Sequence, residues 1–84
     1  MKRQDLYDAL VATEARITSW RQLVDRRLAR IMELERSGSD VSGAKALLAH
    51  FRELLHRDVE QRARILIQLG ELDVGTDPSG MGDR

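Results

Sequence analysis

The chain has 84 residues, a formal net charge of zero, no cysteine and 4% aromatic residues. This length fits at most one small domain and leaves little room for an enzyme that encloses its substrate. Without cysteine, the sequence offers no disulfide scaffold, cysteine-ligated zinc site, iron–sulfur cluster or cysteine nucleophile. No apolar run approaches the roughly 18 residues of a membrane span, and no secretory signal follows Met1. We therefore expect a cytoplasmic protein without a transmembrane segment.

Apolar residues recur at alternating spacings of four and three through the first part of the chain, which predicts a helix over about residues 3–36. This stretch contains no glycine or proline that would interrupt a helix. In a heptad, the a and d positions form a packing seam between helices. The predicted seam consists of Leu6, Leu10, Thr13, Ile17, Trp20, Val24, Arg27, Ile31 and Leu34. Leu23 and Leu28 flank this seam and widen the apolar face around Arg27.

The segment 37–40 interrupts the helical pattern. Gly38 suits the left-handed position that ends a helix, because it has no Cβ to clash. The carboxylate of Asp40 suits the start of the next helix, where it can accept hydrogen bonds from unpaired amides. A stop and a start so close together predict that two helices fold back on each other. One continuous helix through Gly38 is the alternative.

A second helix is predicted over about residues 41–72, which makes residues 1–72 one helical hairpin. Its seam consists of Ala44, Leu48, Phe51, Leu55, Asp58, Arg62, Ile65, Leu69 and Leu72. A neighbouring apolar row consists of Leu47, Leu54, Val59 and Leu66. Gly70 weakens the last turn of this helix. Residues 73–84 contain three Gly and one Pro without periodicity, which predicts a disordered tail.

Folding at the turn places Trp20 near Asp58, Arg27 near Phe51 and Ile17 near Arg62. Trp20 and Phe51 at the same level would contradict this register. Charged seam residues lower stability unless they are paired, but they fix register and partner choice. The Trp20 indole can donate to Asp58, Asp58 and Arg62 are spaced for an ion pair, and Arg27 can lie on the Phe51 ring. The alternative is that these side chains reach the solvent edge of a narrow hairpin.

The sequence thus predicts an all-α, two-helix antiparallel hairpin that is too thin to cover its own apolar face. A two-fold dimer forming a four-helix bundle covers that face most economically, and a different helical protein partner is the alternative. The interface residues predicted for this contact are Leu23, Leu28, Leu47, Leu54, Val59 and Leu66.

Residue patterns for catalysis, metal binding or cofactor binding are missing from the sequence. His50 and His56 are six residues apart, so on one helix they point about 120° away from each other. We therefore predict no catalytic, metal or cofactor residues and no enzyme activity. A small helical enzyme with a site between protomers, built on Glu14, Arg27 and Arg62, is the weakest alternative.

A non-enzymatic protein-interaction module is the predicted function: an adaptor, assembly factor or accessory subunit that acts through its apolar face. The alternative is a small dimeric regulator that binds nucleic acid through Arg16, Arg21, Arg26 and Arg30. Acidic side chains between these arginines and the zero net charge argue against a dedicated nucleic-acid binder.

The residues around the turn carry a resemblance. The run from Glu33 to Asp40, followed by Ala44, Leu47, Leu48, Phe51 and Arg62, resembles short bacterial proteins of unknown function that form a helical hairpin. In these proteins a Leu-Glu-x-x-Gly-x-Asp turn precedes Ala-x-x-Leu-Leu-x-x-Phe, and a His often lies near the position of Asp58. The resemblance implies a bacterial, cytosolic hairpin and brings no known activity with it.

Overall fold

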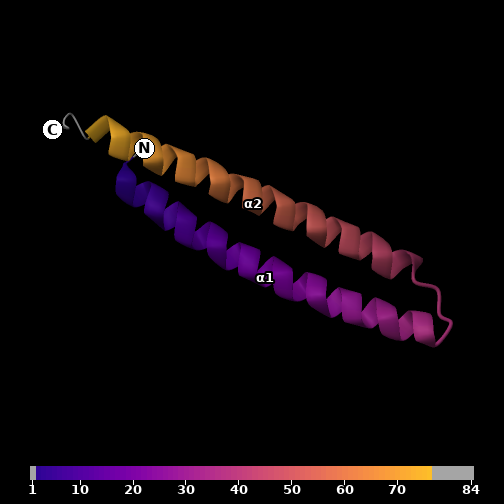
Figure 1. Ribbon diagram of the computed structural model, residues 1–84. Coiled ribbons are helices and arrows are strands. Elements are labelled where there is room, and N and C mark those ends of the chain that lie inside the picture. Colours follow the sequence, from indigo (N-terminus) through magenta and orange to yellow (C-terminus); the bar gives the residue numbers. More distant parts are fainter. Residues whose placement is uncertain (1, 77–84) are drawn as a thin grey trace.

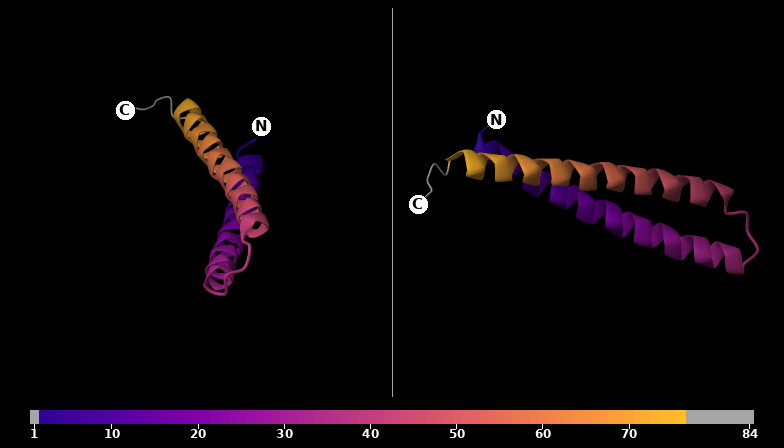
Figure 2. Two further views of the ribbon diagram at one scale, coloured as in Figure 1. Left: turned by 90° about the vertical axis from the view of Figure 1, so that its right-hand side faces the viewer. Right: turned by 45° about the horizontal axis from the view of Figure 1, so that its top comes forward.

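The computed structural model describes residues 2–76, which form two helices, α1 (Arg3–Arg36) and α2 (Ser42–Thr76). The helices pack against each other as an antiparallel hairpin, with the start of α1 and the end of α2 at one end and the turn at the other (Figure 1). We call the end away from the turn the open end. A second view shows that the two helices cross at an angle (Figure 2). Within residues 2–76, neither helix combines the length and apolar character of a membrane span.

The bounds of α1 agree with the predicted range, whereas α2 ends later than predicted. The sequence places the end of the second helix near residue 72, but α2 continues to Thr76. Two glycines, Gly70 and Gly75, lie inside it. A glycine weakens a helix by only about 1 kcal/mol, which is too little to end one by itself. The rest of the predicted disordered tail, residues 77–84, lies outside the described residues.

The turn uses the two residues that the sequence singles out. Gly38 has a φ of 76°, and the backbone amides of Gly38 and Ser39 donate to the carbonyls of Glu35 and Leu34 at 3.1 and 2.9 Å. These bonds satisfy carbonyls at the end of α1 that have no partner inside the helix. The helix therefore ends in a left-handed glycine cap, as predicted.

Asp40 prepares the start of α2. Its Oδ1 accepts hydrogen bonds from the backbone amide of Ser42 at 3.0 Å and from the Ser42 hydroxyl at 2.7 Å. These two hydrogen bonds, the one from the backbone amide first and the one from the hydroxyl second, hold the pKa of the Asp40 carboxyl below its usual value of 3.8. Because folding lowers this pKa, Asp40 stabilises the hairpin above pH 3.8, and the contribution is lost as the pH falls through the lowered pKa.

Replacing Gly38 by alanine should lower the free energy of unfolding by about 1 kcal/mol. Apart from Gly38 and its two chain neighbours, no atom lies within 4 Å of the position that a new Cβ would take, so the cost comes from the left-handed backbone alone. Chemical denaturation followed by circular dichroism measures the change. Gly43→Ala is the matched control: it also meets no atom within 4 Å but lies in α2, so it should raise stability by about 0.4–1 kcal/mol. Equal effects of the two substitutions would contradict this account of the turn.

Among the described residues, six of the seven buried apolar side chains form two separate clusters along the seam, and Ile17, which is 5% exposed, lies between them along α1. The open-end cluster contains Leu6, Ile65 and Leu69, with Leu10 and Leu72 packed against it. The turn-end cluster contains Val24, Ile31 and Leu48, with Ala44 and Phe51 packed against it. All of these are predicted seam positions. Thr13, a polar residue that is 1% exposed, lies between the two clusters along α1.

Candidate functional site

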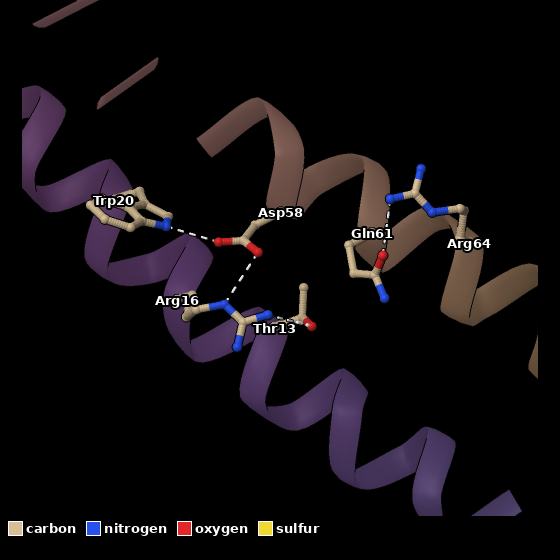
Figure 3. Close-up of polar contacts among 6 residues, drawn as sticks. All are labelled: Thr13, Arg16, Trp20, Asp58, Gln61 and Arg64. Carbon is tan, nitrogen blue, oxygen red and sulfur yellow. Dashed lines mark hydrogen bonds and ion pairs between the residues drawn. The ribbon is translucent and has the colours of Figure 1, made fainter. Parts of the chain in front are cut away.

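A polar cluster joins the two helices at the middle of the hairpin (Figure 3). The Trp20 Nε1–H donates to Asp58 Oδ2 at 2.8 Å, and Arg16 Nε donates to Asp58 Oδ1 at 3.2 Å. Arg16 Nη2 also donates to the Thr13 hydroxyl at 3.2 Å. Asp58, whose side chain is 16% exposed, thus receives two donors from α1. The predicted bond between Trp20 and Asp58 is confirmed.

Arg62 lies at the edge of the hairpin rather than in the seam. Its side chain is exposed, and its Nε donates to Glu14 Oε2 at 3.0 Å. Gln61 is the half-buried residue at this level. The predicted seam position of Arg62 is therefore wrong, and so is the predicted ion pair between Asp58 and Arg62. Each of the two instead pairs across the hairpin, because α1 offers a closer partner of opposite charge to each of them.

Phe51 contacts Trp20 across the hairpin. The ring centroids of Phe51 and Trp20 lie 6.0 Å apart in a stacked arrangement. The Trp20 ring is large enough to reach Phe51 on one side and Asp58 on the other. Because Trp20 bonds to Asp58 and Glu14 to Arg62, the backbone keeps the predicted register although the two rings touch. Arg27 is half-buried, as a seam position should be, and its placement against Phe51 stays a prediction.

Two flanks border the seam, because heptad residues next to the a and d positions fall on opposite sides of it. We call one side the front flank. Two surface hollows on this side are each lined by residues of both helices. One hollow, of about 460 Å³, is lined by Glu14, Ile17, Thr18, Arg21, Val59 and Arg62. The other is lined by Leu28, Ile31, Met32, Glu35, Lys45, Leu48, Ala49 and Arg52. Heptad spacing adds Asp25, seven residues after Thr18, and Leu66, seven after Val59.

The opposite side, the rear flank, carries more positive charge. It contains Arg16, Leu23, Arg26 and Arg30 of α1 and Leu47, Leu54, Arg57, Gln61 and Arg64 of α2. Arg64 Nη2 donates to Gln61 Oε1 at 2.9 Å beside the polar cluster (Figure 3). Arg57, Gln61 and Arg64 are not among the site residues predicted from the sequence. Their spacing relative to the seam nevertheless places them on this side.

The six predicted interface residues divide between the two flanks. Leu28, Val59 and Leu66 lie on the front flank and are 37–40% exposed. Leu23, Leu47 and Leu54 lie on the rear flank and are half-buried. The predicted single row along the second helix is therefore two short rows. The spacing of five residues between Leu54 and Val59 crosses from one side of the seam to the other.

The three residues of the alternative enzyme site do not come together. Glu14 and Arg62 meet, but Arg27 is thirteen residues further along α1, or about 20 Å away, so the three do not converge. Arg21, among the arginines considered for nucleic acid, lies on the front flank, apart from Arg16, Arg26 and Arg30. Across residues 2–76, no three metal-ligating side chains come together.

No protein-family model matches the chain, and neither a curated protein nor a solved structure matches it significantly. The resemblance to bacterial hairpin proteins therefore stays a prediction, and the proposals below rest on the hairpin itself.

Proposed function

We propose that the hairpin is a non-enzymatic protein-interaction module that completes its core by packing against further helices, in the simplest case as a four-helix bundle. The observation that carries this proposal is the set of exposed apolar side chains on the front flank. Met32 is 57% exposed, and Leu28, Val59 and Leu66 are 37–40% exposed. Apolar side chains repeated at heptad spacing along one flank are typical of a contact surface for another helix.

The division of the core supports the same proposal. Two helices can enclose only a single stripe of side chains, and here the polar cluster around Asp58 interrupts that stripe, so that only Ile17 lies buried between two small clusters. Small domains bury a low fraction of their apolar surface, so a hairpin of this size is marginal by itself. Covering a flank with a second helix pair would bury additional apolar surface and stabilise both hairpins.

The substitution Leu66→Asp should abolish association while leaving the hairpin helical. A charge introduced at the centre of an apolar contact costs several kcal/mol, whereas the same charge on an exposed helix position costs little. Light scattering measures the mass of the assembly, and circular dichroism measures the helix content. Leu54→Asp makes the same test on the rear flank.

Ile67→Asp is the matched control, because Ile67 is 61% exposed and lies on the outer side of α2, next to Leu66 in sequence. It should leave the mass of the assembly unchanged. A wild-type chain that stays monomeric and binds no helical partner, or equal effects of Leu66→Asp and Ile67→Asp, would overturn the proposal.

Binding of nucleic acid is the second candidate, because Arg57 and Arg64 of α2 join Arg16, Arg26 and Arg30 on the rear flank. Two of these five are already engaged: Arg16 with Asp58 and Arg30 with Glu33. An electrophoretic shift that weakens steeply with salt would support this function, and the lack of any shift at low salt would exclude it.

A further inference from the structure

The charges on the front flank are sorted between the two helices. Its acidic residues, Glu14, Asp25 and Glu35, lie on α1, whereas Lys45, Arg52 and Arg62 lie on α2. Arg21 is the exception on α1. Two opposite-charge pairs join the helices within one hairpin: Glu14 with Arg62 at 3.0 Å, and Glu35 with Lys45 at 3.5 Å. The flank is therefore bordered by an acidic edge and a basic edge that run along the same length.

Asp25 and Arg52 form the central members of these two edges. Neither makes an ion pair or hydrogen bond within the part of the chain that the structure describes. Arg52 lines the same hollow as Leu28 and Ala49, about one turn from Ala49, and Asp25 lies about one turn from Leu28 in the same direction along the hairpin. Asp25 and Arg52 are thus at the same level of the hairpin, one on each edge.

A second copy of the chain matches this surface when the two turns lie at the same end. A two-fold axis parallel to the hairpin places α1 of one copy on α2 of the other at the same level. Asp25 then faces Arg52 of the second copy, and Leu28 faces Ala49 of the second copy. Acidic edge meets basic edge along both halves of the contact, and complementary charge of this kind selects partner and register.

The other ways of pairing two copies bring like charges together. With the turns at opposite ends, α1 packs on α1 of the second copy, and Asp25 comes near Glu14 of that copy. Pairing through the rear flank with the turns at the same end places Arg16 at the level of Arg57 and Arg64 of the second copy. Like charges in contact destabilise a complex, so both arrangements are disfavoured.

The front flank is also large enough for a stable dimer. At 1.5 Å per residue each helix is about 50 Å long, and two helices lying about 10 Å apart present a face of roughly 1,000 Å². A stable interface needs about 800 Å² from each partner.

We infer that the front flank binds a second copy of this chain, with the two turns at the same end and the acidic edge of α1 against the basic edge of α2. This inference rests on the proposed function and specifies its partner, surface and orientation. The assembly is a four-helix bundle in which Val59 and Leu66 lie between the two hairpins.

A charge exchange tests the contact. Asp25→Arg and Arg52→Asp should each raise the dissociation constant of the dimer about tenfold, measured by sedimentation at low salt. Each substitution puts a like charge opposite residue 52 or residue 25 of the second copy, and two-fold symmetry repeats this repulsion twice in the dimer. The double variant carries both substitutions and should restore the dissociation constant to within about threefold of the wild-type value. Arg57→Asp, the same change on the rear flank, is the control and should not weaken the dimer.

The orientation has its own measurement. The chain has no cysteine, so Ser39→Cys gives one attachment point for a spin label in the turn. Turns at the same end place the two labels about 15–30 Å apart, whereas turns at opposite ends place them about 50 Å apart. The longer distance, or a charge exchange that fails to restore the dimer, overturns the inference while leaving the proposed function intact. A chain that stays monomeric overturns the inference as well, and Leu66→Asp with a helical partner then decides the proposed function separately.

Discussion

Replacing Ile65 by alanine is expected to lower the free energy of unfolding by about 2–4 kcal/mol. Ile65 is 2% exposed and lies in the open-end cluster between Leu6 and Leu69. The substitution removes buried methyl and methylene groups and leaves a cavity that two packed helices close only in part. A domain of this size is stabilised by about 4–12 kcal/mol in total, so the loss is a large fraction of it.

Urea denaturation followed by circular dichroism measures this loss, with every variant at one protein concentration because association shifts the midpoint. Ile67→Ala is the matched control, since Ile67 is 61% exposed and lies two residues further along the same helix. Its effect should stay within about 0.5 kcal/mol. Similar losses for Ile65→Ala and Ile67→Ala would show that α2 does not pack against α1 with Ile65 buried and Ile67 exposed.

Asp58→Ala is expected to cost about 1–3 kcal/mol, because it leaves a donor without its acceptor. The half-buried indole N–H of Trp20 loses the 2.8 Å bond that it makes in the hairpin. Arg16 loses its ion pair at the same time, but its side chain is 51% exposed and water replaces the lost bond. The unpaired indole therefore accounts for most of the expected loss.

A double-mutant cycle separates these contributions. Trp20→Phe removes the donor, so Asp58→Ala should cost less in that background than in the wild type. Glu60→Ala is the control for removing an acidic residue from the exposed side of the same helix, and it should change stability by less than about 0.5 kcal/mol. If Asp58→Ala costs the same with Trp20 or Phe at position 20, the bond to the indole contributes nothing to stability.

The hairpin itself could be predicted from sequence because its determinants are local. The left-handed Gly38, the carboxylate of Asp40 and the four-three spacing of apolar residues each act within a few residues of chain. The end of α2 at Thr76 is not readable from the sequence, because the apolar periodicity ends near residue 72 while the helix continues through Gly70 and Gly75.

The candidate surface was less predictable, because it depends on small rotations of a helix about its axis. Gln61 and Arg62 are adjacent polar residues, and a strict heptad assigns Arg62 to the seam although Gln61 is the half-buried one. An α-helix has 3.6 residues per turn rather than 3.5, so the inward-facing position drifts along a straight helix. The contact between Phe51 and Trp20 depends on the length of the Trp20 ring, which spacing does not express.

The polar cluster around Asp58 also has a consequence for the order in which the hairpin folds. Residues near the turn are close in sequence, so bringing them together costs less chain entropy than joining Leu6 to Leu69. We therefore expect the turn-end cluster to form first and the helices to close progressively toward the termini. At the middle of the molecule this closure meets Asp58 and Thr13, which are 16% and 1% exposed in the hairpin and so must lose most of their water. We therefore expect the central cluster to slow the closure, and the open end to be the part that exchanges its amide hydrogens soonest.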